Sequence, residues 1–564
     1  MIVVPATCRV ALLISICCLA SCGRRGVGGR DGGQAGQAGL SGGGAAGQAG
    51  GGAGGGAGTG GGAGAGGGAG TGGAPGADGG PIFTRVQRLT KDQWERAVGD
   101  ILRFGSPARL LPTRAAPGSD AVDFTNNEKL LFVDLQAELD FESGSEAAAA
   151  QATGSAAALA KLYAGTDATG FVRALGRRAF RRPLTTDEET RYQGVFALGE
   201  QLYGAGFANG AALVIRAMLA SPKFLYRSEL GPAGQPLDGY EIASKLSFWL
   251  LGTTPSDELL DMAAAGGLDA VDGVETVARA MLERPGAVEV MRDFHGQLHH
   301  LSRYDGIDDA RASAALRAEI SDASTRFFDT VFERDEGLQA ILTSSRYFVG
   351  PGLAGNYGVQ PTPIQIEERV LEPSRIGYFM QVPFLLLNGF EDEPDTIARG
   401  VAIDRDVLCV TLLGHTAVPP PLPALAPGQT NRDRIEALTA SCTGCHADSI
   451  DPLGFAFEGF DGMGQARLRD NHVAVDTAAS YPFDEGTRTF AGAAELMRIL
   501  AASAQAHACY ARKLTGYALQ RDIVDGDRAV ITDLAKVSRD RSLKEMVISL
   551  VRNPAFRLRA EDQP

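Results

Sequence analysis

Histidine is scarce in this sequence of 564 residues, which contains seven, and neither an HExxH nor a His-x-His pattern occurs. Catalytic zinc sites are commonly built from such imidazole sets, so their absence argues against a zinc enzyme. The chain also lacks a P-loop, and its net charge of −14 gives it no positive field for nucleic acid phosphates. Nucleic acid is therefore not an expected partner.

The first 22 residues have the pattern of a bacterial export signal. A single Arg9 precedes an apolar run from Val10 to Ala20, and Leu19-Ala20-Ser21-Cys22 resembles a lipobox. We expect cleavage before Cys22 and lipid attachment to it, which would anchor the protein extracytoplasmically, on the periplasmic or surface face of the outer membrane. A plain cleaved signal or an N-terminal membrane helix is the alternative, and no later segment reaches membrane-spanning length.

Residues 23–80 consist almost entirely of Gly and Ala with scattered Ser, Thr and Gln. Such a composition buries too little apolar surface to offset the entropy of ordering. We expect a disordered tether with an average reach of about 40 Å.

From residue 81 onward the hydrophobic periodicity is mainly helical, and the sequence predicts a mainly α, multi-module fold. Thr90 with Gln93 and Thr185 with Glu188 are spaced as capping boxes that begin helices. We expect helical modules at 81–165, 166–232, 233–360 and 486–564, and a cytochrome-c-like module at 361–485.

The segment CTGCH places Cys442 and Cys445 three residues apart and His446 directly after them. This spacing is typical of covalent haem c, with thioethers to both sulfurs and His446 as the proximal iron ligand. The second ring nitrogen of His446 would be held by Asp451 or by the Pro452 carbonyl. A thiol–disulfide pair or half of a zinc site is the alternative, but no second CxxC and no thioredoxin-like βαβ pattern accompany the motif.

The expected cofactor is one haem c, and its sixth iron ligand is not fixed by the motif. We expect Met497 as this ligand, or an open position. The other candidates are Met463, His415, His472 and His507. Apolar cover for the ring edge is expected from Phe455, Phe457 and Phe460.

Three further patterns have structural explanations. Cys409 and Cys509 remain as an even pair in an oxidising compartment, which indicates a disulfide, or else two buried thiols. His295 and His299 are one helical turn apart without a third ligand, so we interpret them as core or surface residues. A stripe of arginines lies along one predicted helix and its end: Arg173, Arg177, Arg178, Arg181 and Arg182. We expect this stripe to be an ion-paired face rather than a binding site for a haem propionate.

Several longer motifs resemble a known family. They are RLTKDQWERAVGDIL, FVRALGRRAFRRPLTTDEE with MLASPKFLYRSE, GYEIASKLSFWLLGTTPSDELLDMAAAG, RGVAIDRDVLC with PPPLP and CTGCHADSIDPLGFAFEGFDGMGQAR, and CYARKLTGYALQRD with LVRNPAFRLR. In this order they resemble the multidomain cytochrome-c-like proteins of Planctomycetes and myxobacteria, built from domain-of-unknown-function families 1587, 1595, 1592, 1588 and 1585. The loop EDEPDTIARG departs from the Ser/Thr and Pro pattern that the family usually shows before RG.

The resemblance implies an exported protein with one haem c at Cys442, Cys445 and His446, while the family's activity is undefined. Secreted companions of unknown function imply an extracytoplasmic protein partner. We therefore expect electron transfer or redox support of that partner. There are two alternatives. One is a cell-surface protein that binds or scaffolds a ligand such as polysaccharide, with a structural haem or none. The other is a peroxidase-like haem enzyme.

Overall fold

The computed structural model describes residues 82–113, 123–361, 365–370, 374–391, 393–412 and 422–559. The predicted lipid anchor and tether lie outside these ranges. Within them the chain is mainly helical with few, short strands, which confirms the predicted fold class. None of the helices in the described ranges combines the length and apolarity needed to cross a bilayer.

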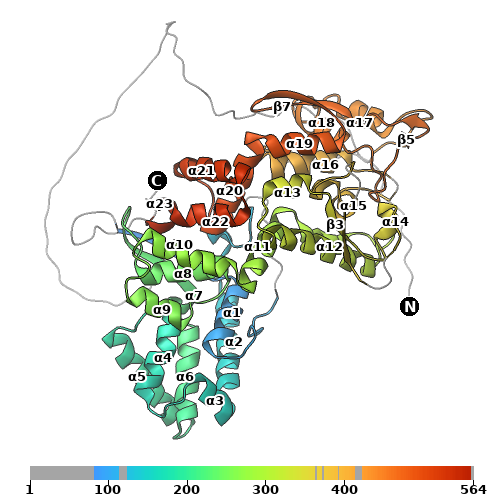
Figure 1. Cartoon of the computed structure of the whole chain (residues 1–564). Coiled ribbons are helices and arrows are strands. Elements are labelled where there is room, and N and C mark those ends of the chain that lie inside the picture. Colours follow the sequence, from blue (N-terminus) through green and yellow to red (C-terminus); the bar gives the residue numbers. More distant parts are fainter. Residues whose placement is uncertain are drawn as a thin grey trace, which may run out of the picture.

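The N-terminal body is a bundle of helices closed by a two-stranded ribbon (Figure 1). Its elements are β1 (Ile82–Arg88), α1 (Lys91–Ile101), η1 (Glu128–Leu130), α2 (Leu135–Thr153), α3 (Ala156–Leu162), α4 (Ala168–Phe180), α5 (Thr186–Tyr203), α6 (Phe207–Leu219), α7 (Pro222–Leu225) and β2 (Tyr226–Pro232). Strand β1 pairs antiparallel with β2, and Arg88 lies opposite Tyr226. Both predicted capping boxes are present, at the starts of α1 and α5.

The larger body begins at α8 and contains the rest of the chain. Its first part comprises α8 (Gly239–Leu250), α9 (Asp257–Ala264), α10 (Val271–Leu282), α11 (Pro285–Leu298), η2 (Leu301–Gly306), α12 (Ala314–Glu333), α13 (Leu338–Thr343), β3 (Arg346–Val349), α14 (Ala354–Tyr357) and β4 (Glu367–Val370).

The segment around CTGCH follows, with the short elements η3 (Tyr378–Met380), α15 (Val382–Leu387), α16 (Thr396–Ala402), η4 (Ile403–Val407), α17 (Asn431–Thr439), η5 (His446–Ile450) and α18 (Asp451–Phe455). The C-terminal part comprises β5 (Arg469–Asp470), β6 (Val473–Ala474), β7 (Ala478–Phe483), β8 (Gly486–Ala491), α19 (Ala493–Ala502), α20 (Ala504–Leu519), η6 (Asp525–Asp527), α21 (Arg528–Asp540), α22 (Leu543–Arg552) and α23 (Pro554–Arg557). Strands β7 and β8 form an antiparallel hairpin.

The five modules expected from the sequence share two hydrophobic cores. One core contains buried side chains from Leu89 to Leu225 together with Phe248 of α8. The other extends from Leu237 to Phe556, with Phe124 added from the N-terminal part. A unit of 60 to 80 residues buries only about 60% of its surface, so shared cores add stability that separate modules would lack.

Helices α16 and α18 pack with their backbones in close contact, and this contact positions the CTGCH segment. A Cβ atom added to Gly454 of α18 would overlap the carbonyl oxygen of Thr396, and one added to Gly400 of α16 would overlap that of Ile450. Only glycine allows this approach at both positions.

We predict that Gly454→Ala lowers the free energy of unfolding by about 1–3 kcal/mol, because the new methyl group must push α16 and α18 apart. Chemical denaturation of the full-length protein measures the effect. The matched control is Gly194→Ala in α5, where an added Cβ meets nothing within 4 Å. That change should be neutral or stabilise by up to about 1 kcal/mol. Equal denaturation midpoints for the Gly454→Ala variant and the wild type would contradict the close packing.

Candidate functional site

The CTGCH segment connects α17 to a widened helical turn. Helix α17 begins with a capping box between Thr430 and Asp433. After the segment, η5 is a π-helical turn, in which the Ile450 amide donates to the Cys445 carbonyl over 3.0 Å. Turns of this kind are rare and occur frequently at functional sites. His446, the predicted iron ligand, is the first residue of this turn.

The His446 side chain is held through one ring nitrogen. The ring is buried, and Nδ1 lies 2.9 Å from Oδ1 of Asp451. The other carboxylate oxygen of Asp451 accepts a hydrogen bond from Thr439 Oγ1 at 2.7 Å. Of the two partners that the sequence offered, Asp451 therefore makes the contact. An imidazole held at Nδ1 by a carboxylate has its tautomer and orientation fixed and keeps Nε2 for a metal.

Cys442 and Cys445 lie half-buried beside exposed Thr443 and Gly444, so both side chains are near the surface. The two cysteines are not joined to each other, and Cys445 takes part in a disulfide. Thioether formation consumes both thiols, so haem attachment requires Cys445 in its reduced form. With that condition, the two sulfurs and the oriented imidazole are the donor set that haem c needs.

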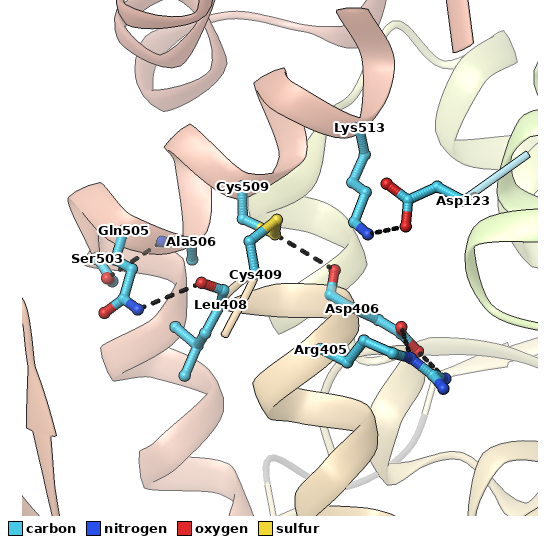
Figure 2. Close-up of a disulfide and its surroundings, with 10 residues drawn as sticks. All are labelled: Asp123, Arg405, Asp406, Leu408, Cys409, Ser503, Gln505, Ala506, Cys509 and Lys513. Carbon is cyan, nitrogen blue, oxygen red and sulfur yellow. Dashed lines mark hydrogen bonds and ion pairs between the residues drawn. A yellow bond between two sulfur atoms is a disulfide. The ribbon is translucent and has the colours of Figure 1, made fainter. Parts of the chain in front are cut away.

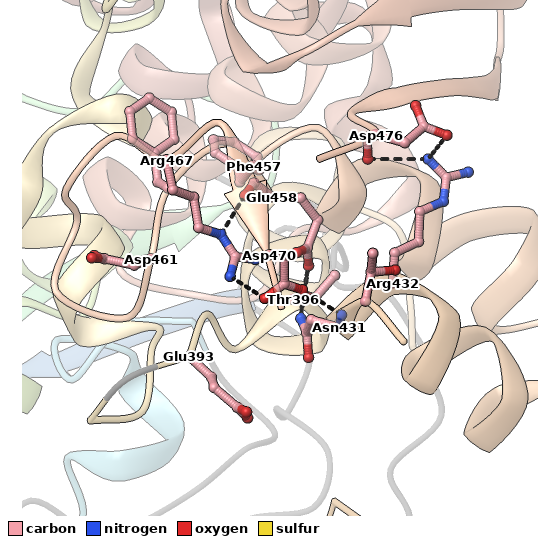
Figure 3. A network of polar contacts seen from close by, with 12 residues as sticks. Glu393, Thr396, Asn431, Arg432, Phe457, Glu458, Asp461, Arg467, Asp470 and Asp476 are labelled. Carbon is pink, nitrogen blue, oxygen red and sulfur yellow. Dashed lines mark hydrogen bonds and ion pairs between the residues drawn. The ribbon is translucent and has the colours of Figure 1, made fainter. Parts of the chain in front are cut away.

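A buried polar network centred on Glu458 joins the starts of the helices on either side of the segment (Figure 3). The Glu458 carboxylate is almost fully buried; one oxygen accepts hydrogen bonds from Thr396 and Asn431, and the other from Arg467. Thr396 begins α16 and Asn431 begins α17, so one carboxylate joins both helices. Asp395 in the loop EDEPDTIARG accepts from the Ala398 amide and caps α16. A fully satisfied network of this kind fixes the geometry of its surroundings.

The three phenylalanines expected to cover a porphyrin edge are already enclosed by protein. Phe457 is fully buried with its ring centroid 6.0 Å from that of Phe384. Phe455 lies under the guanidinium of Arg432, and Phe460 under that of Arg375. These rings belong to the core and to cation–π contacts rather than to an open wall.

Met497, one of the two expected arrangements for the sixth position, is fully buried on α19. That helix packs against α13, α20 and β8, whereas the η5 turn packs against α16, α17, α18 and β7. These contacts give the assignment of Met497 no support.

The other sixth-ligand candidates lie in different surroundings. Both ring nitrogens of His507 are within hydrogen-bond distance of other groups, Ser538 Oγ at 2.8 Å and the Ala501 carbonyl at 3.0 Å. His472 is exposed in the turn between β5 and β6, and Met463 is partly buried. His415 lies outside the described residues. The structure therefore singles out no sixth ligand.

His295 and His299 are core residues, as the sequence suggested. His295 is fully buried, with Nδ1 2.9 Å from the Met291 carbonyl and Nε2 2.9 Å from the Tyr510 hydroxyl. The ring of His299 stacks on Phe328 with centroids 5.0 Å apart. In the described part of the chain, no cluster of three His, Cys, Asp or Glu side chains is arranged for a metal.

The arginine stripe is ion-paired, which confirms the structural interpretation. Its contacts are Arg173 with Glu189, Arg177 with Asp261, Arg178 with Asp257 and Arg182 with Glu188. Buried Arg181 instead donates to the carbonyls of Lys223, Phe224 and Tyr226.

A cavity of about 200 Å³ lies next to this stripe, between α1, α4 and the turns that precede α9 and α11. Arg103 and Arg178 line it, and both pair with the Asp257 carboxylate. The cavity is therefore not a strongly cationic pocket, and it lies apart from the CTGCH segment.

Cys409 and Cys509 form a disulfide with Cα atoms 5.3 Å apart (Figure 2). The bond joins the residues that follow η4 to the middle of α20. It thus connects the neighbourhood of the CTGCH segment to the C-terminal helices across 100 residues of sequence.

The sequence did not single out the buried polar residues of the site. Glu458, Arg399 and Asp404 are each at most 2% exposed. Glu458 stands within the otherwise apolar run GFAFEGF, which is a local signal of a buried polar residue, whereas Arg399 and Asp404 lie in the charged stretch TIARGVAIDRD and carry no such signal.

Four family models match consecutive parts of the chain, and all are described as proteins of unknown function. They are DUF1595 at residues 167–229, DUF1592 at 237–359, DUF1588 at 375–470 and DUF1585 at 486–556. DUF1587, expected at the N-terminal end, is not matched. No curated protein and no solved structure matches the chain.

We predict that replacing both Cys409 and Cys509 by Ala lowers the free energy of unfolding by about 4–5 kcal/mol, because the crosslink closes a long loop in the unfolded chain. Denaturation under non-reducing conditions measures the loss. Wild-type protein treated with reductant is the control and should lose a similar amount. An unchanged midpoint in the double variant would show that the bond contributes no stability.

We also predict acid sensitivity from the buried histidine pair. Burial, reinforced by the positive potential of neighbouring histidines, lowers the pKa of His295 to about 3 and that of His299 to about 4. The unfolded chain then binds more protons than the folded chain below about pH 6.5, so stability is complete above that pH and falls toward pH 4.

The variant His299→Phe keeps the aromatic packing and removes one titrating group. Between pH 7 and pH 4.5 the variant should lose less free energy of unfolding than the wild type, and the difference between the two losses should be about 2 kcal/mol. Denaturation at both pH values provides the measurement, with exposed His472→Gln as the control that leaves the difference unchanged. If His299→Phe kept the pH dependence of the wild type, buried His299 would not be a source of the acid sensitivity.

Proposed function

Because the chain belongs to the multidomain proteins assembled from these four families of undefined activity, we propose that it is an extracytoplasmic c-type haem protein. It carries one haem at Cys442, Cys445 and His446 and transfers electrons with, or supports a redox reaction of, a partner protein. The lipidated Cys22 holds it at a bacterial membrane.

The observation that carries this proposal is the hydrogen bond from His446 Nδ1 to Asp451, at 2.9 Å. It directs the remaining nitrogen, Nε2, to act as a ligand, directly beside the two cysteines of the motif. A thiol–disulfide site would not need an oriented imidazole, and a zinc site would need further ligands that the described residues do not gather.

The residues of the site have separate tasks. Cys442 and Cys445 provide the sulfurs for covalent attachment, and Asp451 keeps the proton of His446 on Nδ1. Thr439 donates to Asp451 and holds that carboxylate in place. A bound haem c supplies a one-electron Fe³⁺/Fe²⁺ couple, whose potential the protein tunes through ligands, hydrogen bonds and burial.

The predicted extracytoplasmic location supports the same function. Haem attachment to CxxCH and disulfide formation both take place outside the bacterial cytoplasm, and the chain combines an export signal with the Cys409–Cys509 disulfide.

One observation favours the alternative of a surface binding or scaffolding protein without haem. Cys445 takes part in a disulfide, and a sulfur in that state forms no thioether. The state of Cys445 in the mature protein therefore separates the two functions.

We predict that full-length protein, exported in a bacterial host with a cytochrome c maturation system, gives a haem-stained band after denaturing electrophoresis and a Soret absorption band. The Cys442→Ser, Cys445→Ser double variant should lose both signals, because no sulfur remains to hold the porphyrin. His446→Ala should lose the iron ligand and with it the native visible spectrum.

The matched control is the Cys409→Ser, Cys509→Ser double variant, which removes the same number of sulfurs and should keep the haem. Mass spectrometry of the wild type is the decisive measurement. A mature chain with no covalently added haem would reject the proposal and favour the binding or scaffolding function.

A further inference from the structure

The cavity of about 200 Å³ beside the arginine stripe lies where the two hydrophobic cores meet. One side of it comes from α1 and α4 of the N-terminal body, and the other from α8, α10 and the turns before α9 and α11. Ligand pockets often occur at such junctions between compact bodies. At about 30 Å³ for each water molecule, the space holds roughly seven waters, so it suits a small molecule.

The apolar part of the cavity wall is drawn from both cores. Ile101 belongs to the core of the N-terminal body, and Leu251, Leu259 and Met281 belong to the core of the larger body. Together these side chains offer a surface for a short hydrocarbon group, which gains free energy when it leaves water.

The charged side chains of the wall leave one positive charge in excess. Arg103 and Arg178 share the carboxylate of Asp257. The two remaining charged residues of the wall are Arg284 and Asp100, so three guanidinium groups stand against two carboxylates. The wall is therefore weakly cationic, and its single surplus charge matches a monoanion.

Two donor groups of this wall have no acceptor among the described residues. Nη1 of Arg178 is enclosed by protein and makes no hydrogen bond, although nearly all buried polar groups have a partner. The side chain of Arg284 is exposed and makes no hydrogen bond or ion pair with the described part of the chain. Arg284 is also the N-cap of α11, where the helix dipole disfavours a cation. An anion bound beside Arg284 would supply an acceptor and relieve this electrostatic conflict.

We propose that this cavity binds a small organic monocarboxylate, with the carboxylate at Arg284 and Arg178 and the hydrocarbon part against the apolar side chains of both bodies. Guanidinium groups bind carboxylates through paired, parallel hydrogen bonds, which gives the site its selectivity for this group. The cavity lies apart from the CTGCH segment, so the binding is a second activity that does not depend on the proposed haem.

Equilibrium dialysis of the purified full-length protein with labelled butyrate tests the proposal, because butyrate combines a carboxylate with a short hydrocarbon chain. The wild type should bind butyrate with a dissociation constant of about 1 mM or lower. Butyramide, the uncharged counterpart, should bind much more weakly. Arg284→Gln should weaken butyrate binding about tenfold or more, because it removes the surplus charge.

The matched control is Arg191→Gln in α5. Arg191 is likewise exposed and has no side-chain partner among the described residues, but it does not line the cavity. This variant should keep the wild-type affinity for butyrate.

Asp100→Asn provides a second test with the opposite sign. Asp100 accepts a hydrogen bond from Thr253 Oγ1 at 2.6 Å, and asparagine can accept the same bond. Loss of its negative charge raises the surplus positive charge of the wall, so butyrate should bind more tightly. Thermal unfolding of each variant without ligand checks that the fold is kept.

Four results overturn the proposal: a wild type that does not bind butyrate, equal binding of butyrate and butyramide, an unchanged affinity in Arg284→Gln, or weaker binding in Asp100→Asn. Inorganic phosphate serves as a further probe. If phosphate bound more tightly than butyrate and required Arg284, the assignment to an organic carboxylate would be wrong.

Discussion

The arrangement around the CTGCH segment depends on one buried guanidinium. Arg399 of α16 is fully buried, and burial lowers its pKa to about 10, so it remains a cation at neutral pH. It donates to the backbone carbonyls of Leu385, Asn388, Phe457, Phe460 and Asp461. A planar group with five donors suits such a set of acceptors. Without it, five carbonyl oxygens that approach from two sides would lose their donor, and the loop after α18 would have no fixed position against α15.

Local interactions explain which parts of the fold could be predicted from the sequence. Capping boxes such as Thr90 with Gln93 depend on residues three apart, so they appear in the sequence as they do in the structure. The π-helical turns could not be foreseen, because their extra residue is accommodated by contacts with distant segments, such as Ser449 with Asp404. The same holds for the two shared cores, which depend on how modules pack and not on their internal patterns.

In the candidate site, too, the features that depend on nearby residues could be predicted and those that depend on distant residues could not. The cysteines, His446 and Asp451 lie within ten residues, so spacing indicated His446 as the candidate ligand and offered two hydrogen-bonding partners, Asp451 and the Pro452 carbonyl, of which the structure shows Asp451. Sequence spacing carries no information about a sixth ligand of the proposed haem, because the candidates lie in other segments of the chain. Buried charges such as Glu458 resemble ordinary surface residues until their partners on α16 and α17 are known.

The division into two cores also limits what a haem at this site would use. In the described part of the chain, the η5 turn packs against α16, α17, α18 and β7 and is hydrogen-bonded to η4, all in the larger body. The N-terminal body is held to α8 by other means, among them the buried ion pair of Lys245 with Glu229 at 3.0 Å, whose atoms are almost fully shielded from water. Because a buried pair is costly to break once one partner is removed, this junction is specific. Among the described residues, the hydrogen bond that orients His446 comes from Asp451 of α18, which belongs to the larger body.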